Sequence, residues 1–331
     1  MRLAHAAVLL SSLAVARPAA ADDGSRSPFL QDFGPNLLAD CPNPEGIAVD
    51  THGFVYASAF SFTPVAQICV LDPGGRLVDK IPVPAGPAGS AALLGMLFIP
   101  HEGLFVTDFA DGASPHGRLL RVDRRGGVHV VAEGFAAPNA IAVDRRGRLY
   151  VSDSFAGTIT RMRADGSGRT TWISDPLLTT AGQPPFGANG LAFDAAERFL
   201  YVANTGDSNV LRIPLRRDGN AGPIEVWAHG ADLDQRTGAT QSLHGADGIQ
   251  FDVDGNLWVC ANQANEVQVL SPSGELRARY RGAGADALDF PASLAFVGRT
   301  LYLTNLSLTT AGVNSKLSVM RAPVAGAPLA R

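Results

Sequence analysis

One pattern recurs along the whole sequence, and it restricts the possible folds more than any other feature. Each copy has a small or Pro-containing turn, a short apolar strand that ends near Asp, a polar turn, and a second apolar or aromatic strand. Clear copies begin at Pro44 and Pro138, with the sequences PEGIAVD and PNAIAVD. Internal repeats of this size are typical of propeller blades or solenoid coils.

Six copies align on the residue that opens the first strand of each. These residues are 45 to 58 positions apart, and they are Glu45, Leu94, Asn139, Asn189, Asp247 and Ser293. The copies continue with a third strand, as in residues 158–162, and a fourth, as in residues 128–131. The sequence therefore predicts an all-β fold, a six-bladed β-propeller of four-stranded blades, with no helix outside the N-terminal leader.

The last copy stops after its third strand, near Val324. We therefore expect the outer strand of the last blade to come from the other end of the chain, from Phe33 to Ala39. Such an N-terminal strand closes the ring. It also removes a sheet edge that would otherwise be open to pairing with other chains.

The N-terminal residues indicate export. Residues 1–21 have a basic start, an apolar run and a small-residue end, which is the order of a cleavable signal peptide. We expect residues 22–331 to form a single propeller domain, a monomer, in the periplasm or outside the cell. No later apolar stretch is long enough to predict a membrane span. Among Cys41, Cys69 and Cys260, one pair could be bridged, or all three could be buried thiols.

The charges argue against nucleic acid as a partner. Loss of Arg2 and Arg17 with the leader leaves 25 basic and 31 acidic residues, and Lys and Arg form no long run. A nucleic-acid-binding surface needs clustered positive charge. The sequence also lacks a G-x-S-x-G motif, so a hydrolase with a serine nucleophile is disfavoured.

The residues that open the first strands are the best candidates for chemistry. The first strand of each propeller blade lines the axis, so these six residues converge at the mouth of the channel. Four of them carry oxygen ligands, and these are Glu45, Asn139, Asn189 and Asp247. Two carboxylates and two amides suit Ca²⁺ best, with Mg²⁺, Mn²⁺ and Zn²⁺ as other candidates. Asn and Asp before a strand are also common turn residues, whereas Glu45 is a poor turn former.

Other polar residues should lie on the same face as these four, around the rim. The candidate substrate contacts are Asp153, Asn204, His244, Asn262 and Asn305. Those at the ends of second strands could equally be turn-forming residues, and His244 could be a proton shuttle or simply solvated. Two long loops, residues 174–188 and 230–246, are expected to cover this face as a mobile lid with apolar side chains.

The motifs Pro44-Glu45-Gly46, Asn189-Gly190-Leu191 and Asp247-Gly248-Ile249 resemble those of the senescence marker protein, gluconolactonase and regucalcin family. The resemblance covers almost the whole mature chain, with paraoxonase and diisopropylfluorophosphatase as more distant relatives. It implies that the four axial residues hold one catalytic divalent ion. It also implies a small-molecule substrate, a sugar lactone or related ester, that is hydrolysed at this ion.

The resemblance further implies that Asp247 is both a metal ligand and the catalytic base, while the other three axial residues position the ion. The family's substrate-binding arginine and acid have no assigned match here. Ser293 and Ala295 stand where distant relatives bind a second ion, so one metal is expected. Two alternatives remain open. One is phosphotriester or aryl-ester hydrolysis at the same ion, and the other is a non-catalytic NHL-like propeller that binds a protein partner.

Overall fold

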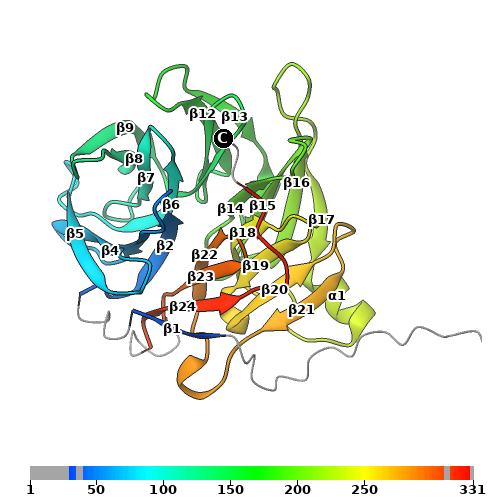
Figure 1. Ribbon diagram of the computed structural model, residues 1–331. Helices are drawn as coiled ribbons and strands as arrows, with labels where there is room; N and C mark the ends of the chain where they lie inside the picture. The colour runs from blue at the N-terminus through cyan, green and yellow to red at the C-terminus, as the bar shows by residue number, and fades with distance from the viewer. Residues whose placement is uncertain (1–29, 35–39, 309–313, 329–331) are drawn as a thin grey trace, which may run out of the picture.

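The computed structural model describes residues 30–34, 40–308 and 314–328 of the chain. Six antiparallel sheets of four strands each stand in a ring, like the blades of a propeller (Figure 1). In five sheets the strands follow one another in chain order. The fold is therefore the six-bladed β-propeller that the repeat predicts.

The blades follow the chain, and the first strand of each is innermost. Blade 1 contains β2 (Pro44–Val49), β3 (Val55–Ala59), β4 (Val65–Leu71) and β5 (Leu77–Pro84). Blade 2 contains β6 (Leu93–Ile99), β7 (Gly103–Asp108), β8 (Gly117–Val122) and β9 (Val128–Phe135). Blade 3 contains β10 (Pro138–Val143), β11 (Arg148–Asp153), β12 (Thr158–Arg163) and β13 (Thr170–Ser174).

The second half of the ring repeats this plan. Blade 4 contains β14 (Ala188–Phe193), β15 (Phe199–Asn204), β16 (Asn209–Pro214) and β17 (Glu225–His229). Blade 5 contains β18 (Ala246–Phe251), β19 (Leu257–Ala261), β20 (Glu266–Leu270) and β21 (Leu276–Tyr280). Blade 6 contains β22 (Pro291–Val297), β23 (Thr300–Asn305), β24 (Lys316–Arg321) and the N-terminal β1 (Gln31–Phe33).

An N-terminal strand closes the ring, as predicted. The first strand of the chain, β1, lies beside the last, β24 (Figure 1), and Phe33 pairs with Leu317. The predicted boundaries were wrong, because the strand ends at Phe33; residues 35–39 lie outside the described part of the chain. Phe33 is buried and meets Tyr302 edge to face at 5.0 Å, so apolar packing sets where the strand ends.

Every first strand carries a β-bulge where it begins. In blade 1, Pro44 pairs with Ala59 but Ile47 pairs with Ala57, so one extra residue stands on the inner strand. The same shift occurs in the other five blades. A bulge re-aims the side chains next to it, and here it recurs at one end of the channel, which we call the site mouth.

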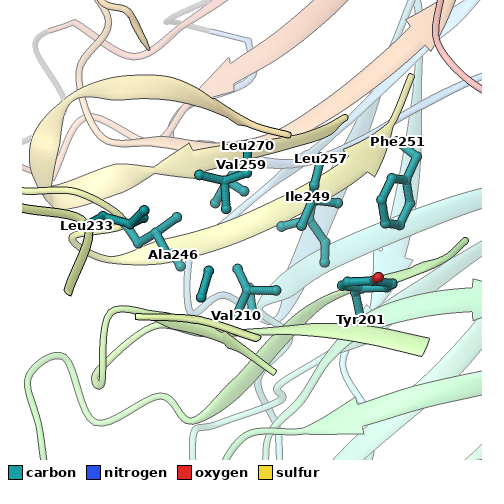
Figure 2. Packing of buried hydrophobic residues seen from close by; sticks show 12 residues of the cluster. Tyr201, Val210, Leu233, Ala246, Ile249, Phe251, Leu257, Val259 and Leu270 are labelled. Atoms are coloured by element: carbon teal, nitrogen blue, oxygen red, sulfur yellow. The ribbon is translucent and has the colours of Figure 1, made fainter. Parts of the chain in front are cut away.

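The hydrophobic core lies between neighbouring blades. Figure 2 shows one such cluster, in which Ile249 and Leu257 of blade 5 face Tyr201 and Val210 of blade 4. Each blade buries one face of its sheet against the next, and a fully buried aliphatic or aromatic side chain contributes about 1.5–3 kcal/mol. The ring of clusters makes the wall around the channel rigid, which is what a site at its mouth requires.

One helix contradicts the expectation of a fold without helices after the leader. Helix α1 (Gly230–Thr237) follows β17 and ends at Gly238, whose φ of 71° suits glycine. Leu233 is fully buried and anchors the helix to the core between blades 4 and 5. The helix was missed because it is short and is held by this single buried leucine rather than by a repeated apolar stripe.

The structure settles the pairing of the cysteines. Cys41 and Cys69 form a disulfide with Cα atoms 6.1 Å apart, and Cys260 is a buried free thiol. The bridge ties the segment before β2 to the third strand of blade 1. Within the described residues, the helices are too short or too polar to span a membrane.

Candidate metal centre

The bulges define a ring of six equivalent residues at the site mouth, which we call the axial ring. Each is the second residue of a first strand, and the six are Glu45, Leu94, Asn139, Asn189, Asp247 and Ala292. All are buried, with at most 5% of their surface exposed. The structure therefore brings together the four predicted metal ligands.

The sixth position corrects the sequence alignment. Ser293 was placed in this ring, but the pairing of Pro291 with Asn305 and of Leu294 with Leu303 puts Ala292 there. Ser293 corresponds to Gly46 of blade 1, on the far side of the bulge. An alignment on Ser293 is one residue out of register, because Leu294 rather than Ala295 occupies the position that Ile47 has in blade 1.

Two buried carboxylates meet at this mouth. Burial raises the pKa of Glu45 well above its usual range, and the charge of Asp247 raises it further. Glu45 and Asp247 belong to blades 1 and 5, with blade 6 between them, and both occupy axial positions. Glu45 Oε2 and Asp247 Oδ1 are buried without a hydrogen-bond partner.

Asn262 holds the carboxylate of Asp247. Burial raises its pKa from the usual 3.8 to about 7, although bonds from Asn262, Asn189 and the N–H of Gly248 act in the opposite direction. Asn262 Nδ2 donates to Asp247 Oδ2 over 2.8 Å, which leaves Oδ1 toward the axis without a donor. The predicted candidate Asn262 therefore lies directly against the proposed base.

The donor set fits a hard divalent cation. A buried carboxylate pair with unpartnered oxygens is costly unless a positive charge compensates it. Asn189 donates its Nδ2 to Thr205 Oγ1 over 3.0 Å, which orients the amide, and Asn139 adds a second amide. Among the described residues no three His, Cys, Asp or Glu side chains cluster, so this arrangement favours the oxygen-only coordination of Ca²⁺ or Mg²⁺ over a zinc site.

Hydroxyl groups on the second strands hold the axial ring in place, and the sequence reasoning missed them. Ser58, Thr107, Ser152 and Thr304 each donate to the carbonyl of the next blade's axial residue. The bond from Thr304 Oγ1 to the carbonyl of Glu45 is 2.6 Å long and joins blade 6 to blade 1. A Ser or Thr one residue before the end of the second strand recurs in four of the six blades and could have revealed this role.

A second ring of equivalent residues lies against the axial ring. Each member follows a second strand and donates its N–H to the carbonyl two residues before the axial residue of its own blade. This ring consists of Phe60, Phe109, Ser154, Thr205, Asn262 and Leu306. Thr205 and Asn262 contact the axial side chains Asn189 and Asp247 directly.

Three of the predicted substrate contacts hold loops instead. Asp153 accepts hydrogen bonds from the N–H groups of Ala136 and Ala137, Asn204 donates to the carbonyls of Leu177 and Thr179, and Asn305 donates to Ser318 Oγ. All three are buried with their polar atoms used in this way. The structure favours the turn-forming interpretation, so we leave these three out of the proposed site.

His244 lies in a loop with a tightly specified conformation. Gln241 and Leu243 both have positive φ values, of 60° and 55°, which non-glycine residues rarely adopt. The buried Gln268 holds this loop by accepting the N–H of Leu243 over 2.8 Å and donating to the carbonyl of Gln241 over 3.1 Å. His244 itself is half-buried, and its Nδ1 has no partner.

Both long loops end at the site mouth, but most of their apolar groups point inward. Leu178, Leu233 and Leu243 are fully buried and serve as anchors. Leu177 is 38% exposed and Phe186 is half-buried, so these two remain available at the surface. A lid function of these loops stays a prediction.

A cavity of ≈190 Å³ lies in the other half of the channel. Its walls are mostly apolar residues of the first strands, with Arg145, Asp194 and Glu197 also lining it, and none of the predicted site residues does. We place the site at the other mouth because a reactive centre needs convergent polar groups, and the unpartnered carboxylates are there.

The fold and the site together define a class: a six-bladed β-propeller with two acids and two amides converging at one mouth of its channel. Residues 174–311 match the family described as "SMP-30/Gluconolactonase/LRE-like region". The matched region contains the motifs at Asn189 and Asp247, in agreement with the family resemblance that these motifs indicate. A comparison with curated protein sequences found no match.

Solved structures resemble the chain over most of its length. A gluconolactonase from Xanthomonas campestris is 19% identical, with 86% of this chain and 87% of that chain covered and a TM-score of 0.61. A calcium-binding protein, regucalcin, from Agrobacterium tumefaciens is also 19% identical, with coverage of 87% and 93% and a TM-score of 0.62. A luciferin-regenerating enzyme is 15% identical, with coverage of 91% and 98% and a TM-score of 0.65. At such identities the likeness establishes the fold, and the chemistry must be argued from the site.

Proposed function

We propose that this protein is a divalent-metal-dependent hydrolase of lactones or related esters. Glu45, Asn139, Asn189 and Asp247 would hold one ion, with Ca²⁺ as the first candidate. The observation that carries the proposal is the pair of buried carboxylates with unpartnered oxygens at the site mouth. The family match over residues 174–311 supports lactone chemistry.

The bound ion would act as a Lewis acid that polarises the ester carbonyl. We assign the role of base to Asp247: Asn262 donates to its Oδ2, and Oδ1, which has no protein donor, would have to give up its place as a metal ligand to accept the proton from water. The water oxygen then bonds to the carbonyl carbon and the ring C–O bond breaks. The proton taken by Asp247 passes to the leaving oxygen, which gives the hydroxy acid and restores the carboxylate.

The residues around Asp247 set its position as a base. Asn189 donates its Nδ2 to Thr205 Oγ1, and the same amide side chain lowers the pKa of Asp247, against the larger effect of burial. Thr205 Oγ1 in turn donates to the carbonyl of Ala246 over 2.8 Å, next to Asp247 in the chain. A base held at several points needs little rearrangement during the reaction.

Hydrolysis of a panel of lactones, aryl esters and phosphotriesters in Ca²⁺, Mg²⁺, Mn²⁺ or EDTA tests the proposal. We expect lactone turnover with an added ion, loss in EDTA, and a loss of at least 100-fold in Asp247→Asn. Asp254→Asn is the matched control, because Asp254 is exposed in the turn between β18 and β19, at the other mouth. Full activity in EDTA, or in Asp247→Asn, would contradict the proposal.

The same assay separates the alternatives. Preference for phosphotriesters or aryl esters would keep the metal site and change the substrate. A non-catalytic scaffold that binds a protein has no need for two buried, repelling carboxylates, so ion binding measured by calorimetry argues against it.

We also propose that the protein is exported, to the periplasm or the cell exterior, and acts there as a monomer. The bridge between Cys41 and Cys69 supports this location, since disulfides persist in oxidising compartments. The expected signal peptide, residues 1–21, lies outside the described residues. Fractionation of cells that produce the full chain tests the location.

A further inference from the structure

The site mouth is divided into a polar arc and an apolar arc. In blades 3, 4 and 5 both rings carry polar residues: Asn139 with Ser154, Asn189 with Thr205, and Asp247 with Asn262. In blades 6 and 2 both carry apolar residues: Ala292 with Leu306, and Leu94 with Phe109. Blade 1 lies between blades 6 and 2, so its Phe60 continues the apolar arc in the second ring, whereas its Glu45 interrupts that arc in the axial ring.

A cluster of five phenylalanines extends the apolar arc outward. We call it the phenylalanine cluster, and it consists of Phe60, Phe62, Phe109, Phe155 and Phe186. The neighbouring ring centroids are 5.2 to 6.1 Å apart, so the five side chains form one continuous surface. They come from loops of blades 1 to 3 that all open on the site mouth.

The cluster begins at the axis and ends in solvent. Leu94 of the axial ring belongs to a buried group with Phe109, and Phe60 and Phe186 pack against this group. Phe109 is 5% exposed, whereas Phe62 is 53% and Phe155 is 40% exposed. A protein surface rarely has large exposed apolar side chains grouped beside a polar centre. Such a group marks a binding site for an apolar ligand or for the apolar part of a ligand.

The donor groups of the second ring's polar side chains are, by contrast, used within the protein, while Asn262 Oδ1 and His244 Nδ1 are buried acceptor or donor atoms without a hydrogen-bond partner. Ser154 donates to the carbonyl of Ala188, Thr205 donates to the carbonyl of Ala246, and Asn262 donates to Asp247. A polyhydroxylated substrate would lose its water on this surface without gaining a hydrogen bond for each hydroxyl. A phenylalanine ring can stack on a sugar face, but the sugar rim would still need such partners.

We propose that the site takes lactones or esters with an aromatic or alkyl substituent, which lies on the phenylalanine cluster, in preference to polyhydroxylated sugar lactones. This inference rests on the proposed hydrolase function and names its substrate class. The reacting carbonyl is then held over the polar arc, and the apolar substituent points along Leu94 and Phe109 toward Phe62 and Phe155. The site discriminates between the two kinds of substrate because burial of an apolar substituent against the cluster is favourable, whereas a hydroxyl group finds no hydrogen-bond partner on the phenylalanine rings.

The test compares three δ-lactones of the same ring size on the full chain with saturating Ca²⁺: phenyl-substituted, unsubstituted and polyhydroxylated. We expect kcat/KM for the phenyl-substituted lactone to exceed that for the polyhydroxylated lactone by at least tenfold. Phe62→Ser and Phe155→Ser should each lower kcat/KM for the phenyl-substituted lactone about fivefold, mainly through KM, and leave the unsubstituted lactone unchanged. Val253→Ser is the matched control, since Val253 is 58% exposed but lies at the other mouth, and it should change none of the three.

The outcomes separate this inference from the function on which it rests. Equal or better hydrolysis of the polyhydroxylated lactone, or no effect of either Phe variant, overturns the substrate class and leaves the hydrolase intact. If no lactone or ester is hydrolysed with any ion, the proposed function fails. Calorimetry with the unreactive phenyl-substituted and polyhydroxylated δ-lactams then decides the binding preference without catalysis, and tighter binding of the polyhydroxylated lactam would refute it.

Discussion

The replacement of Asp247 by Asn should make the metal-free protein more stable at neutral and alkaline pH, although it removes the proposed catalytic base. In the absence of an ion, Asp247 is a buried carboxylate that faces a second one, Glu45. Asn has the same shape and carries no charge. It can still accept the bond from Asn262, and its Nδ2 replaces the oxygen that lacks a donor.

The magnitude follows from the pKa of Asp247, which burial raises from 3.8 to about 7 in the folded, metal-free protein. Between these two values the folded state holds a proton that the unfolded chain has lost. The contribution of Asp247 to the free energy of unfolding is therefore greatest below pH 4, and it falls as pH rises toward 7. A difference of about three pH units corresponds to about 4 kcal/mol, at 1.36 kcal/mol per unit.

Urea denaturation in EDTA between pH 5 and pH 8 measures this effect. We expect the wild type to lose about 3 kcal/mol across this range, and Asp247→Asn to lose much less, with the remainder due to Glu45. Asp254→Asn should behave like the wild type, because Asp254 is exposed at the other mouth. With saturating Ca²⁺ the order should reverse, since only the wild type retains the full ligand set. A metal-free wild type whose stability is flat or rises from pH 5 to pH 8 would refute the electrostatic argument.

Three further predictions concern the ring. Thr304→Val removes the hydroxyl that holds the carbonyl of Glu45, and it should lower the free energy of unfolding by about 1–3 kcal/mol and weaken Ca²⁺ binding in calorimetry. An unchanged Ca²⁺ affinity would show that this bond does not support the metal centre. Phe33→Ala empties a buried site on the closing strand, and we expect a loss of about 3 kcal/mol in urea denaturation and faster proteolysis of the N-terminus, whereas wild-type resistance would argue against closure by β1. Replacement of Cys41 and Cys69 by Ser should lower the free energy of unfolding by about 3 kcal/mol without changing kcat, and equal stability would show that the bridge is dispensable.

The sequence by itself determined the number of blades and five of the six axial residues. Each blade repeats the same order of apolar strands and polar turns, and such a local pattern can be read without knowing the partners of each strand. Glu45 and Asp247 could be recognised because an acid at the start of an apolar strand has no local reason to be there. The strand that closes the ring could be predicted from the missing fourth strand of the last blade, but its boundaries could not, because they depend on packing against Tyr302.

Other features were decided only by the tertiary structure. The strand pairing of blade 6 puts Ala292 rather than Ser293 in the axial ring. The bond from Asn262 to Asp247 spans 15 residues, and the pairing of Cys41 with Cys69 was one of several possibilities in the sequence.

The phenylalanine cluster shows the physical reason for this division. Its members are spread from Phe60 to Phe186, and each occurs in a loop whose composition is ordinary. They meet because the closed ring turns the loops of blades 1 to 3 onto one mouth, beside Leu94. Strand periodicity is a local property of the chain and is visible in one dimension. The convergence of side chains at the axis depends on ring closure, because only the folded ring brings together residues that are more than a hundred positions apart in the chain.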